Sequence, residues 1–82
     1  MRYKAWYLDQ FVTRTSERKY THAVLWIKDG KITSHVNWCG SFDLAVKQAQ
    51  RKHDPMWSPI IAAAQSSREV QESRFVPSEH AQ

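Results

Sequence analysis

The sequence predicts a small α+β domain in which one or two helices pack on one face of a three-stranded antiparallel sheet, in the order β-β-β-α-α. Three observations lead to this prediction: an aromatic-rich first segment, two apolar segments that flank Asp29-Gly30, and a helical spacing of apolar residues after Gly40. The 82 residues allow one domain. We expect it to span residues 1–72 and to be followed by a flexible polar tail, residues 73–82.

The first predicted strand covers residues 2–12, which are rich in aromatic and other β-forming side chains. Residues 13–19 are polar and charged, which is typical of a solvated loop. We therefore expect residues 13–19 to connect the first strand to the next one.

A β-hairpin over residues 20–39 is the clearest local signal. Asp29-Gly30 suits a two-residue turn, because both positions need a positive φ angle and these residues tolerate it. A four-residue loop over residues 28–31 gives the same register, in which Ile27 pairs with Ile32 and Ala23 with Val36. One face of the hairpin is then apolar and forms the core: Ala23, Leu25, Ile27, Ile32, Val36 and Trp38. The second face carries Tyr20, His22, Val24, Trp26, Thr33, His35, Asn37 and Cys39.

Two helices are expected after the hairpin. Ser41 is a preferred N-cap residue, and Asp43 suits the positive end of the helix dipole. Apolar residues then follow at helical spacing: Phe42, Ala45, Val46 and Ala49. Asp54-Pro55 ends this helix, and Ser58-Pro59 predicts the start of a second one, from residue 60 to about residue 72. Between the helices, Met56 and Trp57 form either a plug that seals the core or an exposed apolar knob.

The second face of the hairpin is the first candidate site. If it is open, its aromatic side chains can stack on bases or anchor a protein interface. If the second helix or the tail covers it, Trp26 belongs to the core. The candidate residues are Tyr20, His22, Trp26, His35 and Asn37.

Positive charge defines the second candidate site. Residues 1–52 contain ten basic and four acidic side chains, a net charge of +6, within a chain whose formal net charge is +4. Such a segment suits phosphate groups or an acidic partner, and the alternative is a solvated charged periphery. The candidate residues are Arg14, Arg18, Lys19, Lys28, Lys31, Arg51 and Lys52.

The sequence contains no phosphate-binding loop, zinc-ligand pattern or nucleophile motif. Cys39 is the only cysteine, so no intramolecular disulfide can form. The lack of a disulfide and the absence of an apolar signal segment together predict a cytoplasmic protein. His22 lies diagonally to Cys39 in the predicted register and could lower the pKa of its thiol. We expect neither a metal nor a cofactor.

Residues 21–49 form a strand, a turn, a strand and a helix that opens with Ser41-Phe42-Asp43. This order is similar to that of the DNA-binding domains of the integrase arm-binding type, in which a three-stranded sheet packs on a helix. The resemblance implies DNA binding by the sheet. The second face of this hairpin has no arginine or lysine, and in this it departs from that pattern.

Together these observations predict a non-enzymatic binding protein: an inhibitor or adaptor, of the kind that phages and mobile elements encode. We expect protein–protein contact with a larger protein or nucleoprotein complex, and no membrane partner. The alternative is a basic nucleic-acid-binding domain that uses the loop cations and an aromatic sheet face. A Cys-His enzyme is the remote alternative.

Overall fold

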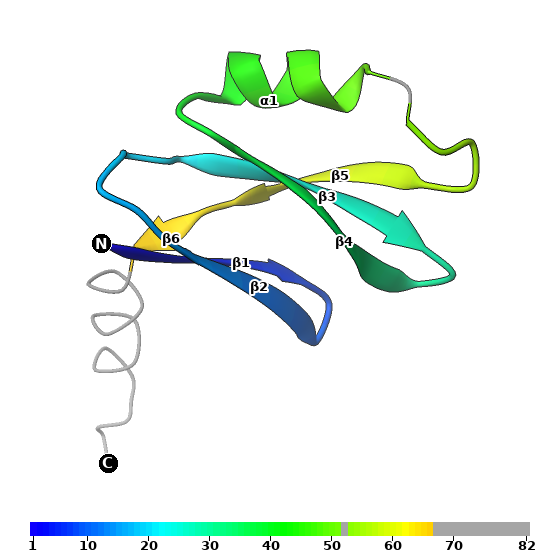
Figure 1. Ribbon diagram of the computed structural model, residues 1–82, viewed down its shortest axis with the longest axis horizontal. Coiled ribbons are helices and arrows are strands. Elements are labelled where there is room, and N and C mark those ends of the chain that lie inside the picture. Colours follow the sequence, from blue (N-terminus) through cyan, green and yellow to red (C-terminus); the bar gives the residue numbers. More distant parts are fainter. Residues whose placement is uncertain (52, 67–82) are drawn as a thin grey trace.

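The computed structural model describes residues 1–51 and 53–66. Its elements are β1 (Arg2–Tyr7), β2 (Gln10–Thr15), β3 (His22–Lys28), β4 (Lys31–Cys39), α1 (Phe42–Ala49), β5 (Ser58–Ala63) and β6 (Gln65–Ser66). The strands form two three-stranded antiparallel sheets, a first sheet in the order β2-β1-β6 and a second sheet in the order β4-β3-β5 (Figure 1). The predicted α+β class is confirmed. The prediction of a single sheet was wrong, because the chain forms two.

The second sheet is covered on both faces, by α1 on one side and by the β1–β2 hairpin on the other (Figure 1). Its central strand, β3, is therefore buried over five consecutive residues, from Ala23 to Ile27. Alternate side chains of β3 enter two separate cores. The inter-sheet core contains Ala5, Ala23, Leu25 and Ile27, and the helix-side core contains Val24, Trp26, Cys39 and Ala45.

The β3–β4 hairpin turns at Asp29-Gly30 as predicted. Both residues have positive φ angles, 53° and 76°, and Lys28 pairs with Lys31 across the two-residue loop. Ile27 pairs with Ile32 as expected, but the register then shifts, so that Leu25 pairs with Val36. Because the shift amounts to two residues, the paired side chains of β3 and β4 keep their predicted faces. Tyr20, which precedes β3, does not, because its ring packs between Tyr3 and Trp38 on the side of the first sheet. The predicted core face is confirmed, since its six residues all belong to the inter-sheet core or pack against it.

Residues 2–15 form a hairpin rather than the predicted strand and loop. β1 and β2 pair antiparallel from Arg2–Thr15 to Tyr7–Gln10, and the turn residues are Leu8 and Asp9. The turn contains no Gly, Asn or Pro, and Asp9 is its only turn-forming residue, so the sequence marks it weakly. Tyr3, Ala5, Tyr7 and Val12 face the second sheet, whereas Lys4, Trp6 and Phe11 lie on the outer face.

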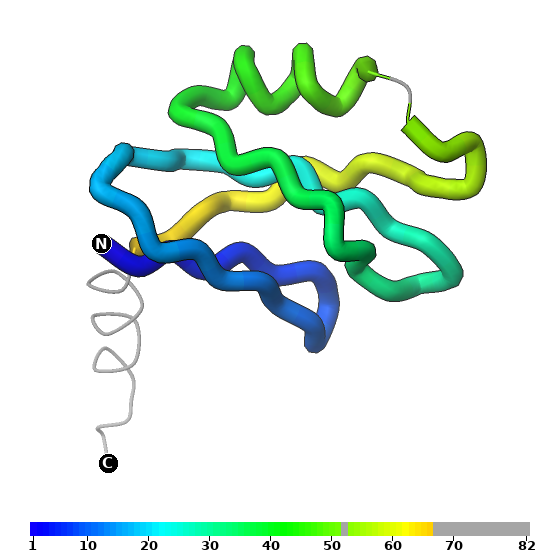
Figure 2. Tube along the Cα trace, viewed as in Figure 1, coloured from blue at the N-terminus to red at the C-terminus, as the bar shows by residue number. Residues whose placement is uncertain are grey.

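The predicted second helix is wrong for its described part, because residues 58–66 are extended. β5 pairs with β3 along its whole length, and β6 then pairs with β1, so this segment passes from one sheet to the other (Figure 2). Pro59 is tolerated because β5 is an edge strand of its sheet. At the crossing point, the Ala64 amide donates to the Thr21 carbonyl at 2.9 Å. Residues 67–72 of the predicted helix, and the predicted tail, lie outside the described residues.

The first helix begins as predicted: the Leu44 amide donates to the Ser41 hydroxyl at 3.2 Å, and Asp43 lies in the first turn. Ala45 is fully buried and Ala49 packs on the helix-side core. Phe42 was predicted on the inner face, but it is 54% exposed and contacts the ring of His22 edge-on instead of entering the helix-side core. Within the described residues, no helix has both the length and the apolar character needed to cross a membrane.

Gln10 connects the two hairpins at their tips. Its Nε2 donates to the Gly30 carbonyl at 2.7 Å, and its Oε1 accepts from the Ile32 amide at 2.9 Å. One side chain of β2 therefore fixes the turn of the β3–β4 hairpin relative to the first sheet.

Leu25→Ala should destabilise the domain by about 2–5 kcal/mol, because Leu25 is fully buried in the inter-sheet core and its removal leaves a cavity. Leu44→Ala is the matched control, since Leu44 is 49% exposed on α1. We expect the control to cost roughly 0.5 kcal/mol or less. Urea denaturation followed by circular dichroism measures both values, and equal losses would contradict the assignment of the core.

Candidate functional site

The second face of the hairpin is covered in this structure. Trp26 is 2% exposed, and α1 and Trp57 pack against the helix-side core that contains it. The Trp26 Nε1 donates to Asn37 Oδ1 at 2.8 Å, which satisfies the buried indole. Trp26 is therefore a core residue and is not presented for base stacking. The second sheet, to which the integrase-type resemblance applies, is covered on both faces and so has no open face for the DNA contact that the resemblance implies.

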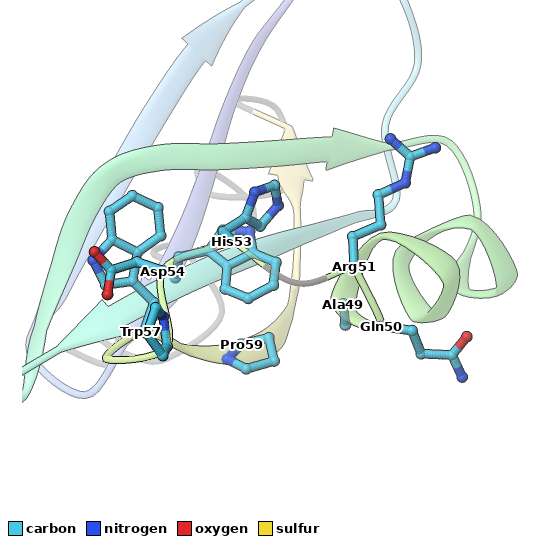
Figure 3. Close-up of a pocket in the computed structure, with 9 residues that line it drawn as sticks. Ala49, Gln50, Arg51, His53, Asp54, Trp57 and Pro59 are labelled. Carbon is cyan, nitrogen blue, oxygen red and sulfur yellow. The ribbon is translucent and has the colours of Figure 1, made fainter.

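The segment after α1 completes this cover. The Asp54 carboxylate accepts from the Met56 amide at 2.8 Å, and the Asp54 carbonyl accepts from the Trp57 amide at 3.0 Å. This turn places Trp57 against the helix-side core, as expected for a plug, while Met56 is 65% exposed. Trp57 and Pro59 line a cavity of about 460 Å³ that reaches the end of α1, and Figure 3 shows these side chains.

His35 belongs to an aromatic cluster with residues that line this cavity. Its ring centroid is 4.4 Å from that of His53 and 5.8 Å from that of Trp57. The ring of His53 also stands edge-on to Trp26, at 4.5 Å. The Nε2 atom of His35 is buried without a hydrogen-bond partner in the described part of the chain. The cluster thus holds the 53–57 segment mainly by ring contacts.

His22 and Cys39 are directly opposite each other in the register, rather than diagonal. The His22 ring stands edge-on to Phe42 at 5.4 Å, and its Nδ1 lies 2.8 Å from the Thr21 hydroxyl. Cys39 is 5% exposed, and burial raises the pKa of its thiol. A nucleophilic thiolate needs a lowered pKa, so the shift at Cys39 has the opposite direction.

The predicted basic residues do not form one surface. Lys28 and Lys31 flank the hairpin turn, Lys19 is exposed in the segment before β3, and Arg51 lies at the cavity beyond α1. Lys52 lies outside the described residues. Arg14 and Arg18, in contrast, come together with Tyr20 and Asn37 around a second cavity, of about 260 Å³. The structure thus unites four residues that the sequence placed in two different candidate sites.

The groups around this second cavity lower the pKa of Tyr20. A hydrogen bond with the Ser16 side chain lowers the pKa of the Tyr20 phenol, and the positive charges of Arg14 and Arg18 act in the same direction, against the effect of burial. The Arg14 guanidinium carbon lies 5.9 Å from the centroid of the Tyr20 ring. These contacts stabilise negative charge at the Tyr20 oxygen.

A third surface was missed by the sequence analysis. On the outer face of β1–β2, Trp6 is 45% and Phe11 50% exposed, and Leu8 in the adjoining turn is 78% exposed. The rings of Trp6 and Phe11 lie 4.9 Å apart, because the two residues are paired across the strands. We call Trp6, Leu8 and Phe11 the hairpin patch. The alternation of Tyr3, Ala5 and Tyr7 with Lys4 and Trp6 is the sequence signal that could have indicated it.

Within residues 1–51 and 53–66, no three His, Cys, Asp or Glu side chains are grouped so that they could hold a metal ion. Comparison with protein-family models, with curated proteins and with solved structures finds no match to this chain. The candidate sites therefore rest on their own geometry.

Ser16→Ala should raise the pKa of Tyr20 toward the ordinary value of a tyrosine, because it removes the largest cause of the lowering. A pH titration that follows the Tyr20 ring carbon signals by NMR measures the shift. Ser34→Ala, at an exposed serine of β4, is the control and should leave the Tyr20 pKa unchanged. An unchanged titration of Tyr20 in the Ser16 variant would refute this account of its environment.

Proposed function

We propose that the chain is a non-enzymatic protein-binding module, an inhibitor or adaptor, that contacts a larger protein through the hairpin patch. The observation that carries this proposal is the exposure of Trp6, Leu8 and Phe11 together at one end of one hairpin. An 82-residue chain has little apolar surface to spare, and clustered exposed apolar side chains typically mark an interaction surface. Tryptophan in particular is enriched among the residues that dominate binding energy.

The backbone at Leu8 supports the same proposal. Leu8 has a φ angle of 55°, in the left-handed region that costs an L-residue with a Cβ roughly 1–2 kcal/mol. Glycine would avoid this cost at the first position of a two-residue hairpin turn. Because Leu8 is 78% exposed, burial of its side chain contributes little to the stability of the fold. A leucine at this position is therefore better explained by a contact outside the chain than by stability.

Lys4 adds a positive charge to the hairpin patch. Its Nζ lies 4.3 Å from the centroid of the Phe11 ring and 5.3 Å from that of the Trp6 ring. The ammonium group therefore lies against the ring surface of the patch. The same group, beside two apolar rings, suits a partner that offers an apolar pocket with a carboxylate at its rim.

Trp6→Ala should abolish capture of a stoichiometric protein partner from cells of the source organism, with the chain immobilised as bait. Phe42→Ala is the matched control, because Phe42 is an equally exposed aromatic residue, on α1. It should retain the partner. The unmodified chain should retain the partner when the salt concentration is raised from about 50 mM to about 200 mM, because an apolar anchor depends little on ionic strength. Contacts with phosphate groups would weaken steeply over this range.

Two outcomes would refute the proposal. One is a partner that binds Trp6→Ala as well as the unmodified chain. The other is recovery of nucleic acid, with no stoichiometric protein, whose retention falls steeply with salt; this would favour the nucleic-acid-binding alternative. Urea denaturation of both variants verifies that each remains folded.

Leu8→Gly should separate stability from binding. We expect the variant to be about 1 kcal/mol more stable, because glycine adopts the positive φ angle without strain. It should also bind the captured partner more weakly, because the most exposed side chain of the hairpin patch is lost. Urea denaturation and a titration with the purified partner measure the two effects. Unchanged affinity would remove Leu8 from the patch.

A further inference from the structure

The cavity at Arg14 and Arg18 lies on the opposite side of the β1–β2 hairpin from the hairpin patch, and the proposed docking function does not use it. It has a volume of about 260 Å³, and four parts of the chain contribute to it: β2, the segment between β2 and β3, β4, and α1. Its polar lining comes from Arg14, Arg18, Tyr20, Asn37 and Gln48. No aspartate or glutamate is among the described residues that line it.

Arg14 occupies an unusual place for a charged residue. It pairs with Tyr3, which is 3% exposed and faces the second sheet, so Arg14 belongs to the inward face of β2. Its guanidinium lies near the Tyr20 ring, within a cavity that opens to solvent at this end of the sheets. The fold therefore places a permanent positive charge at the mouth of a recess, where the Arg14 side chain remains exposed to solvent.

The segment that carries Arg18 is fixed in place before any ligand binds. The Tyr3 hydroxyl donates to the Arg18 carbonyl at 2.9 Å, and the Arg18 amide donates to the Ser16 hydroxyl at 3.0 Å. Ser16 is held in turn by Met1, since the Ser16 amide donates to the Met1 carbonyl at 2.9 Å and the terminal ammonium donates to the Ser16 carbonyl at 3.0 Å. Such preorganisation lowers the entropy cost of binding.

Neutral donors face the same cavity. Asn37 has its Oδ1 engaged by the Trp26 indole, so its Nδ2 is the atom that can donate elsewhere. Tyr20 is held between Tyr3 and Trp38, with ring centroids 5.2 Å and 6.0 Å from its own. Two arginines, an asparagine and a tyrosine, from β2, β4 and the segment between β2 and β3, thus line one small volume.

We propose that this cavity binds a phosphate group, as inorganic phosphate or as a small phosphate monoester. Two arginines offer planar pairs of donors that match phosphate oxygens, and the amide and hydroxyl can serve the remaining oxygens of a tetrahedral anion. The absence of a carboxylate from the described lining favours an anionic ligand. The volume leaves room for a small ester substituent but lies below the roughly 300–1,000 Å³ of drug-sized ligand pockets.

Titration with inorganic phosphate, followed by ¹H–¹⁵N NMR at constant ionic strength, tests the proposal. Saturable shifts should be confined to Arg14, Arg18, Tyr20, Asn37 and Gln48 and should not appear with chloride. Arg18→Gln should weaken phosphate binding by about tenfold or more, because it removes a charge-assisted hydrogen bond. Lys28→Gln removes an equal charge from the hairpin turn, and it should change the affinity for phosphate by less than about twofold.

Arg18→Lys distinguishes a paired-donor contact from simple attraction. It should bind more weakly than the unmodified chain, although the charge is kept, because a lysine offers no planar pair of donors. Titration with a nucleoside 5′-monophosphate, and with single-stranded oligonucleotides with and without a 5′-phosphate, identifies the source of the group. Binding of the oligonucleotide with a 5′-phosphate, and not of the one without it, supports the proposal. Equal binding of both oligonucleotides would instead assign the cations to a nucleic-acid backbone.

Shifts that grow linearly with phosphate and spread over Lys28 and Lys31 would overturn the proposal, since they indicate an adventitious ion only. This outcome differs from failure of the docking function, because Trp6→Ala leaves the cavity untouched and should bind phosphate normally. Arg18→Gln should likewise retain the protein partner.

Discussion

The burial of β3 on both faces is the constraint on which the rest of the structure depends. Ala23, Leu25 and Ile27 need the first sheet to cover them, and Val24 and Trp26 need α1 and the segment that ends at Trp57. A chain of 82 residues meets both needs with three thin layers rather than with one large core. As a result the outermost sheet face has no layer left to cover it, and Trp6 and Phe11 remain exposed there.

What could be predicted from the sequence depends on local chemistry. The turn at Asp29-Gly30 follows from the φ angles that a two-residue loop requires, and the start of α1 follows from the Ser41 cap. The assignment of faces survived an unpredicted bulge, because a shift of two residues preserves the alternation of side chains. The candidate cations Arg14 and Arg18 were found by charge alone, but their union with Tyr20 and Asn37 was not predicted, because it depends on how the sheets meet.

The errors arise where a distant partner decides the local structure. An apolar run such as residues 60–64 fits a buried helix or a strand equally well, and here the free edge of β3 selects the strand. Strand β5 then continues into β6 and joins the two sheets, which no pattern within those residues specifies. The covering of Trp26 likewise depends on contacts with Trp57 and α1, far along the chain. Leu8-Asp9 turns the chain without a turn-forming glycine, so the first hairpin was not recognised.

The β1–β2 hairpin contributes to both proposed surfaces, and the alternation of side chains keeps them apart. Trp6 and Phe11 are paired on the outward face, whereas Arg14 is paired with Tyr3 on the inward face. The inward face is closed by apolar packing at Ala5, and near the end of β2 Arg14 and Tyr20 line a cavity. A ligand in that cavity would contact β2, β4 and α1 together, and so could stabilise the arrangement of the two sheets without approaching the hairpin patch. Binding at one surface would then affect the other only through the hairpin itself, whose tip Gln10 ties to the turn of β3–β4.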